Sequence, residues 1–156
     1  MLNETRTHLD LLNDARARVW KILEGLDHDA LNWRPTPDAS NSLYALATHC
    51  LGAERRWIHH QVGAQSITRD RDAEFRALAE NIATLQLTYA QVALLSAEII
   101  HRLSAHDLDA MRGDAAHQQS VRWCILHVVE HYNEHIGQMA LTRQLWENRH
   151  ARLNEI

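Results

Sequence analysis

Apolar residues recur every three or four positions along most of this chain, which is the period of an amphipathic helix. The first such run predicts a helix over residues 2–25, with a stop at Gly25. A second run predicts a helix over residues 43–62 that ends at Gly63. The segment between them, residues 26–41, holds both prolines and is expected to be a long connection that finishes in an N-cap.

The next apolar run predicts a third helix that begins with Asp70 or Asp72 as its cap and continues to about residue 103. Its seam alternates steps of three and four residues, which is the spacing of helices packed in a bundle. The residues of this seam are Phe75, Leu78, Ile82, Leu85, Tyr89, Val92, Ile99 and Leu103. One position between Val92 and Ile99 is left open, and Leu95 and Ser96 are both candidates for it.

The last third of the chain predicts a polar loop and then a long helix. Residues 106–119 include a glycine and several aspartates and are expected to form the loop. Ser120 is expected to cap a fourth helix that runs to about Asn148. The residues beyond it, including His150 and Arg152, are expected to be a frayed tail.

Composition supports an all-α protein. The 156 residues contain only 5 Gly and 2 Pro, 46% of them are hydrophobic, and the period of a strand is absent. Four amphipathic helices with long connections predict a four-helix bundle, and this length suits a single domain over residues 1–156. Ligand and metal sites in such bundles are built from side chains that point inward on facing helices.

The net charge and the number of cysteines limit which classes of partner and which cellular compartment are expected for this protein. The net charge of −4 provides no basic face for nucleic acid and no basic anchor for a membrane surface. The two cysteines, Cys50 and Cys124, are too few for a disulfide framework, and no signal peptide precedes the first helix. A cytoplasmic protein is therefore expected, with both cysteines in the core as small hydrophobic residues.

The most informative pattern is a set of histidines spaced four residues apart on the fourth helix. With Val128 as the centre of the buried stripe, His135 lies roughly 20° away, His131 roughly 60° and His127 roughly 100°. His131 and His135 therefore point inward together, one turn apart, and are well placed to bind one metal ion. His127 lies at the margin of the buried stripe. This favours a position on the surface, or one in which its side chain contacts a metal ligand without binding the metal.

A catalytic zinc site usually takes three protein ligands, so a third donor is expected from another helix. The second helix offers His49 and Glu54, and helical periodicity slightly favours Glu54 without settling the choice. The histidine spacing also occurs in HExxH zinc proteases, but there a glutamate follows the first histidine. Here Val128 and Tyr132 hold that place, so a protease of this type is excluded.

Five short motifs follow one another along the chain. They are Leu31-Asn32-Trp33-Arg34-Pro35, Asn41-Ser42-Leu43, His49 with Glu54 and Trp57, Arg122-Trp123, and His131-xxx-His135-x-Gly137-Gln138. In this order they resemble the DinB-like (YfiT-like) metalloenzyme superfamily over the full length of the chain. The resemblance implies a four-helix bundle of up-down-down-up topology that is often a homodimer and binds a divalent metal ion.

The resemblance also implies the ligand set, which by position is His49, His131 and His135. Zinc or nickel is the expected ion, and iron and manganese also accept imidazole. Glu54 then becomes either an acceptor for a ligand N–H group or a partly exposed acid paired with an arginine. Gln138 is expected either to orient a metal-bound water or to make a structural hydrogen bond.

The superfamily implies a function as well. Some members resemble metal-dependent transferases or isomerases that use a low-molecular-weight thiol such as mycothiol, bacillithiol or glutathione, with an electrophile as second substrate. Arg143 is a candidate contact for a carboxylate of the thiol, and a solvated or salt-bridged arginine is the alternative. Catalytic residues other than the metal ligands are not identified. The rival hypotheses are a metal-binding or stress-response bundle without turnover, and a metal-free interaction module.

A structural ion would need a fourth protein ligand, for which His127 and Cys124 are the candidates. The remaining histidines fall in predicted loops, helix ends or unpatterned positions, and are expected to be solvated. They are His8, His28, His59, His60, His101, His106, His117 and His150.

Overall fold

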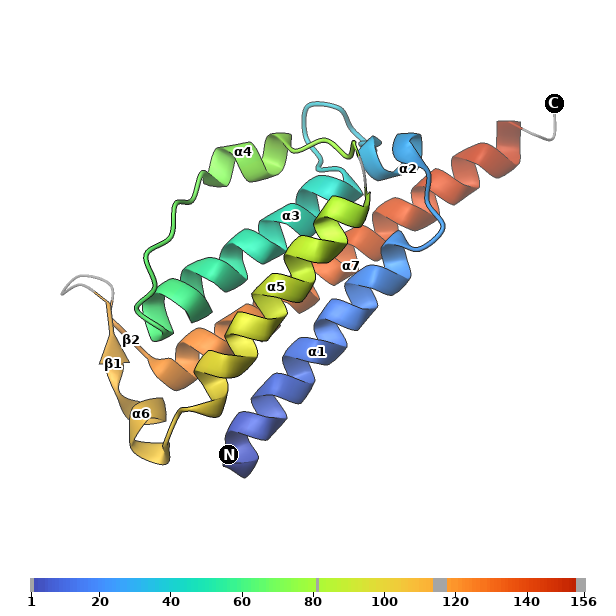
Figure 1. Cartoon of the computed structure of the whole chain (residues 1–156). Helices are drawn as coiled ribbons and strands as arrows, with labels where there is room; N and C mark the ends of the chain where they lie inside the picture. Colours follow the sequence, from blue (N-terminus) through green and yellow to red (C-terminus); the bar gives the residue numbers. More distant parts are fainter. Residues whose placement is uncertain (1, 81, 114–117, 154–156) are drawn as a thin grey trace.

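This computed structural model describes residues 2–80, 82–113 and 118–153, and the side chains of all of these except residues 150–153. Its backbone is a bundle of four long helices (Figure 1). These are α1 (Asn3–Leu23), α3 (Leu43–Glu54) with its continuation η1 (Arg55–Val62), α5 (Ile82–His101) and α7 (Val121–Leu153). Helices α1 and α7 run in one direction and α3 and α5 in the other, which confirms the all-α, up-down-down-up prediction (Figure 1).

The first two predicted helices are confirmed. Helix α1 ends two residues before Gly25, whose φ of +74° is a conformation that glycine adopts without strain. Helix α3 and η1 together cover the predicted 43–62, and η1 is a π-helix that ends at Gly63. The cap of α3 is Ser42, whose hydroxyl accepts from the amide of Ala45. The connection before it contains one short helix, α2 (His28–Asn32).

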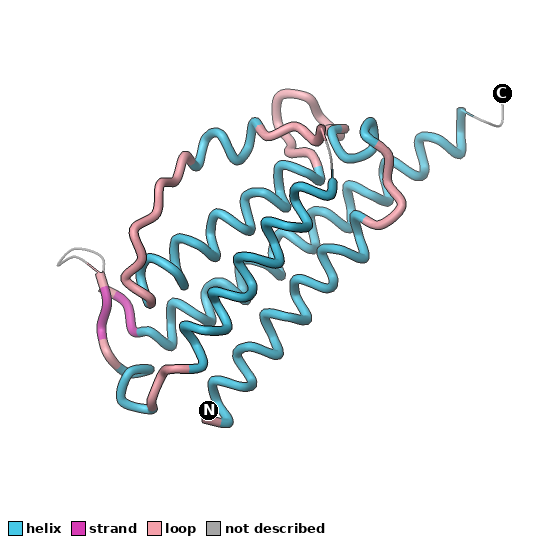
Figure 2. Tube along the Cα trace, viewed as in Figure 1, coloured by secondary structure: helices cyan, strands magenta, loops and turns pink. Residues whose placement is uncertain are grey.

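The prediction of a single third helix was wrong, because the structure has two separate helices in this part of the chain. A short helix, α4 (Arg71–Arg76), is capped by Asp70, one of the two expected caps, and residues 77–80 after it are not helical (Figure 2). The Asn32 side chain bonds both the amide and the carbonyl of Ala79, so the backbone there is held by tertiary contacts. Leu78, which was expected in the buried seam, is exposed. Ser96 is fully buried and occupies the seam position for which Leu95 and Ser96 were both candidates.

The predicted loop before the last helix also contains regular structure. A short helix, α6 (Ala105–Asp109), leads into a hairpin of two-residue strands, β1 (Met111–Arg112) and β2 (Gln119–Ser120). Ser120 caps α7 as predicted, because its hydroxyl accepts from the amide of Trp123. Helix α7 continues to Leu153, beyond its predicted end near Asn148, and the rest of the predicted tail, residues 154–156, lies outside the described residues.

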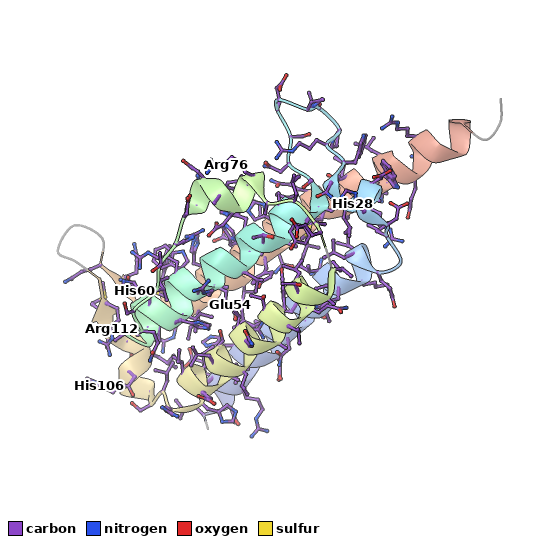
Figure 3. The ribbon with its side chains drawn as sticks, turned by 45° about the horizontal axis from the view of Figure 1, so that its top comes forward. His28, Glu54, His60, Arg76, His106 and Arg112 are labelled. Carbon is purple, nitrogen blue, oxygen red and sulfur yellow. The ribbon has the colours of Figure 1, made fainter. Side chains whose placement is uncertain are left out.

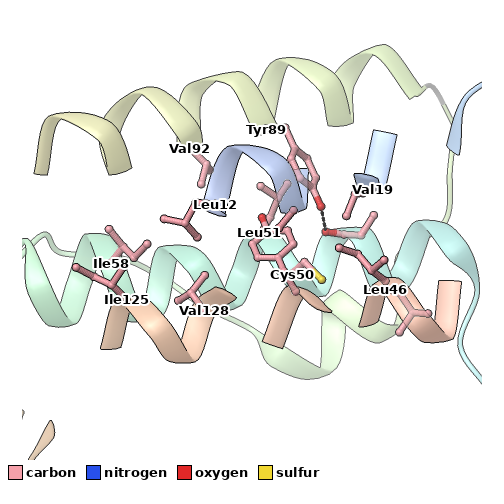
Figure 4. Packing of buried hydrophobic residues seen from close by; sticks show 14 of the residues in the cluster. Leu12, Val19, Leu46, Cys50, Leu51, Ile58, Tyr89, Val92, Ile125 and Val128 are labelled. Carbon is pink, nitrogen blue, oxygen red and sulfur yellow. Dashed lines mark hydrogen bonds between the residues drawn. The ribbon is translucent and has the colours of Figure 1, made fainter. Parts of the chain in front are cut away.

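The core lies between the four long helices, where leucine, isoleucine and valine side chains interdigitate (Figure 4). Cys50 and Cys124 are fully buried, free thiols, as predicted. Burial raises the pKa of both thiols, that of Cys124 to about 11. Among the described residues, α5 is the one helix that is long and apolar enough to cross a membrane. A single helix of this kind does not identify a membrane protein, because core helices of helical bundles have the same length and composition.

One buried carboxylate contacts all four long helices. Glu54, labelled in Figure 3 at the end of α3, is fully buried. It pairs with Arg16 of α1, whose Nε donates to Oε2 over 3.2 Å. Tyr132 of α7 donates to the same oxygen over 2.9 Å, and Ser96 of α5 donates to Oε1. His59 is buried beside them with its Nε2 3.0 Å from the Ser96 hydroxyl. A charged group without these partners would be expensive to bury.

Of the histidines expected to be solvated, His28, His60, His101 and His106 are exposed. The expectation was wrong for His8 and His59, which are 5% and 4% exposed. His117 and the side chain of His150 lie outside the described residues.

Candidate metal centre

Three histidines meet where α3 packs against α7. His49 of α3 and His131 and His135 of α7 each offer a ring nitrogen, and these nitrogens lie within 4.8 Å of one another. The Nε2 atoms of His49 and His131 are 3.1 Å apart. Two imidazole nitrogens on a tetrahedral zinc ion lie about 3.3 Å apart, so this pair already has the required spacing. The structure therefore brings together the three predicted site residues, which could hold a metal ion.

Two of the three imidazoles are oriented by a side chain behind them. Nδ1 of His49 lies 2.8 Å from Oε2 of Glu74, and Nδ1 of His135 lies 2.9 Å from Oε1 of Gln138. Both oxygens accept hydrogen bonds, so Nδ1 carries the proton and Nε2 keeps its lone pair for a metal. Of the two expectations for Gln138, the structure gives it the hydrogen-bonding role, toward His135.

Glu74 is a site residue that the sequence did not predict. It lies on the short helix α4, and Arg69 holds it with two hydrogen bonds of 2.7 and 2.8 Å. Its carboxylate lies directly over Gly52, where a Cβ atom would be 1.8 Å from Oε1. Glycine at position 52 therefore makes room for Glu74 to reach His49, one turn earlier on the same helix. The Phe75 ring packs against the His49 ring at 4.2 Å between centroids.

Burial favours the neutral form of two of the three imidazoles, His49 and His131, and the neutral form is the one that binds metals. Burial lowers the pKa of His49, although its hydrogen bond to Glu74 opposes this shift. Burial, reinforced by the neighbouring His135 and His49, lowers the pKa of His131 to about 3. Nδ1 of His131 is buried and has no hydrogen-bond partner among the described residues, so no side chain orients this ring as Glu74 and Gln138 orient the other two. The donor set and its protonation therefore fit a divalent ion such as zinc.

The other candidates do not join the three histidines. Glu54 is not a third ligand and does not accept from a ligand N–H group, because its carboxylate is occupied by Arg16, Ser96 and Tyr132. The arginine pairing expected for Glu54 is present, but the residue is buried instead of partly exposed. His127 stacks on Trp123 at 4.6 Å between ring centroids, and its ring lies 6.0 Å from that of His131.

Arg143 does not face the three histidines. Its Nη1 donates to the carbonyl oxygens of Lys21, Ile22 and Glu24 at the end of α1, and its Nε pairs with Glu147. These contacts satisfy carbonyl groups that a helix end leaves without partners. Of the two alternatives given for Arg143, the structure shows the salt-bridged arginine, which pairs with Glu147 and also caps the end of α1.

The up-down-down-up bundle and its three inward histidines define the class of this protein as DinB-like. The model of the mycothiol-S-transferase family matches residues 7–148, and the chain belongs to this family. A search of curated proteins finds no significant match.

Solved structures support the same fold. A conserved protein from Enterococcus faecalis superposes with a TM-score of 0.74 at 13% sequence identity, over 93% of this chain and 98% of the other. A DinB-like protein from Bacillus cereus superposes with a TM-score of 0.73 at 18% identity, over 90% of this chain and 91% of the other. At these identities the likeness shows the fold alone.

The contacts of Glu74 lead to a prediction about metal affinity. Replacing Glu74 with glutamine removes the carboxylate that orients His49 and is expected to weaken zinc binding about 10-fold to 100-fold. Gly52→Ala is expected to weaken it as well, because the new methyl group displaces Glu74. Competition against a chromophoric chelator measures the affinity. Asp72→Asn, an exposed change on the same helix, is the matched control, and equal affinities for E74Q and D72N would contradict the role of Glu74.

Proposed function

We propose that this protein is a metal-dependent thiol S-transferase in which His49, His131 and His135 hold a divalent ion, with zinc or nickel as the preferred metal. The observation that carries the proposal is the group of three converging, buried or half-buried histidines in a member of the mycothiol-S-transferase family. Among the described residues no fourth histidine, cysteine, aspartate or glutamate joins that group. Three protein ligands are typical of catalytic sites, whereas structural zinc sites are closed by four.

The side chains around the site have separate tasks in this proposal. Glu74 and Gln138 hold the rings of His49 and His135 so that Nε2 of each faces the common point. A divalent ion with an open coordination position lowers the pKa of a bound thiol and so supplies a thiolate at neutral pH. In the overall reaction the thiol S–H group gives its proton to solvent, and the sulfur forms a bond to an electrophilic carbon. The leaving group departs with the electron pair of the bond that breaks.

The family and the ligand number favour an enzyme over the rival hypothesis of a metal-binding bundle without turnover. That rival needs a fourth protein ligand, and neither His127 nor Cys124 belongs to the group. The native thiol is proposed to be of the mycothiol class, in line with the family. The single domain over residues 1–156, the homodimer, the cytoplasmic location and the absence of nucleic-acid and membrane partners stay predictions.

The experiment that tests this function is a conjugation assay with protein purified without a histidine tag. Zinc-loaded and nickel-loaded samples are incubated with mycothiol, bacillithiol, glutathione and cysteine, each against a panel of electrophiles. We expect at least one thiol to be conjugated faster than in the metal-free sample, and His135→Ala to remove the difference. If no thiol shows a metal-dependent rate with any electrophile, the transferase proposal fails.

A further inference from the structure

A cavity of about 350 Å³ lies beside the three histidines, between the connection that precedes α3 and the outer half of α7. Pro35 and Asn41 of the connection line one side, and Leu141 and Leu145 of α7 line the other. The cavity thus joins two motifs that are far apart in the sequence, Leu31–Pro35 and Asn41–Leu43, to the helix that carries two of the three histidines. None of the three histidines belongs to these motifs, although Asn32 and Arg34 hold the backbone around α4.

The cavity and the histidine group share a wall. Gln138, which orients His135 through a hydrogen bond of 2.9 Å, also lines the cavity. Leu46 lines it from α3, one turn before His49 on the same helix. A molecule in the cavity is therefore separated from the ligand His135 by a single side chain. With Oε1 of Gln138 accepting from His135, its NH₂ group keeps donors for another molecule.

The lining identifies the chemistry of the occupant. None of the described residues around the cavity is charged, so nothing there neutralises a carboxylate or an ammonium group. Five of the nine lining residues are apolar, and two of these, Leu141 and Leu145, leave 56% and 42% of their surface exposed. The lining hydroxyl groups of Ser40 and Thr142 already donate to backbone carbonyl oxygens of the chain. The Asn41 side chain makes no hydrogen bond to another described residue and so remains available to a ligand. An uncharged lining in which apolar side chains stand beside the amide groups of Asn41 and Gln138 suits an uncharged, mainly apolar ligand.

We propose that this cavity binds the uncharged, apolar part of the electrophilic substrate, while the reacting carbon lies at the three histidines. The inference rests on the proposed function, because it assumes a second substrate beside the thiol. A charged group does not match this cavity, because no lining residue could neutralise its charge. A cavity of about 150 Å³ holds benzene, so this one holds an alkyl chain or an aromatic group roughly twice that size.

Alkyl hydroxamates of increasing length test the inference by binding instead of turnover. The hydroxamate group chelates zinc through its two oxygens, and the tail reports on the neighbouring surface. Dissociation constants of acetohydroxamate, butanohydroxamate, hexanohydroxamate and octanohydroxamate for the zinc-loaded protein are measured by calorimetry. We expect the affinity to rise about twofold to fourfold per added methylene until the cavity is full. Leu141→Gln and Leu145→Gln should weaken octanohydroxamate at least fivefold and leave acetohydroxamate unchanged.

Leu126→Gln is the matched control, because Leu126 lies on the same helix with 42% of its surface exposed and does not line the cavity. If acetohydroxamate does not bind the zinc-loaded protein, the accessible metal centre of the proposed function is wrong and this inference falls with it. If acetohydroxamate binds but chain length has no effect, or if L126Q and L145Q act alike, only the cavity proposal is overturned. The proposed function then stands.

Discussion

Replacing His135 with alanine should abolish tight metal binding and lower the melting temperature of the zinc-loaded protein. The change removes one of three converging imidazoles. Loss of a residue that merely orients a ligand costs about 10-fold to 100-fold in affinity, so loss of a ligand should cost more. An ion that binds only the native state stabilises it by about 2.7 kcal/mol at 100 times its dissociation constant. For a chain of this size that corresponds to roughly 5–10 °C.

Elemental analysis of untagged protein after dialysis gives the metal content, and calorimetric melting with and without zinc gives the stabilisation. His127→Ala is the matched control, since His127 lies one turn outside the histidine group and stacks on Trp123. We expect it to retain about the wild-type metal content. A full equivalent of zinc in H135A, or a large loss in H127A, would show that the ligand set is assigned incorrectly.

Replacing Glu54 with alanine should cause the largest loss of stability of any single change considered. The substitution leaves the Arg16 guanidinium buried without its partner and removes the acceptor for Ser96 and Tyr132. Breaking a buried ion pair by removing one partner costs about 3–5 kcal/mol, because the remaining charge stays desolvated. Urea unfolding of the metal-free protein measures the change in the free energy of unfolding.

Two variants keep this prediction testable even if E54A does not fold. The double variant Arg16→Met with Glu54→Leu removes both charges and should be more stable than E54A, because no unpaired charge remains. Glu134→Ala, an exposed change on α7, should alter stability by less than about 0.5 kcal/mol. A cost below about 1 kcal/mol for E54A would contradict the central role of this carboxylate.

Helical periodicity predicted the four long helices and the pair of histidines on α7, because one face of that helix is buried and the other is exposed. It did not separate His49 from Glu54 on α3. Nearly all residues of α3 are buried, since α7 packs on one side and α4 on another. A helix that is buried on all sides has no polar face to define the inward direction. The choice of His49 came from the resemblance to a family, and the geometry agrees with it.

Glu74 was missed because its position depends on contacts that periodicity does not contain. The pattern of the third predicted helix continued through residues 77–81, whereas residues 77–80 are not helical and bonds between Asn32 and Ala79 hold them in place. The break leaves α4 free to lie over α3, and the space above Gly52 admits the carboxylate. A glycine three residues after a candidate ligand on a buried helix was the one available signal.

The burial of His59 has a similar origin. His59 was expected to be solvated, but α5 packs against η1, and Nε2 of His59 lies within hydrogen-bond distance of the Ser96 hydroxyl and the Val92 carbonyl oxygen. Serine at position 96 supplies the partner inside an apolar seam. The contact between His59 and Ser96 could be predicted only if the relative alignment of η1 and α5 were known. Periodicity within each helix does not give that alignment.

X-ray absorption at the zinc edge tests the central claim most directly, because it reports the ligands of the ion itself. For the zinc-loaded protein we expect three imidazole nitrogens and one further light atom at about 2.0 Å. Addition of the thiol that supports conjugation should replace that light atom with a sulfur at about 2.3 Å. Sulfur before any thiol is added, a fourth imidazole, or a spectrum that no thiol changes would contradict three histidines with an open position.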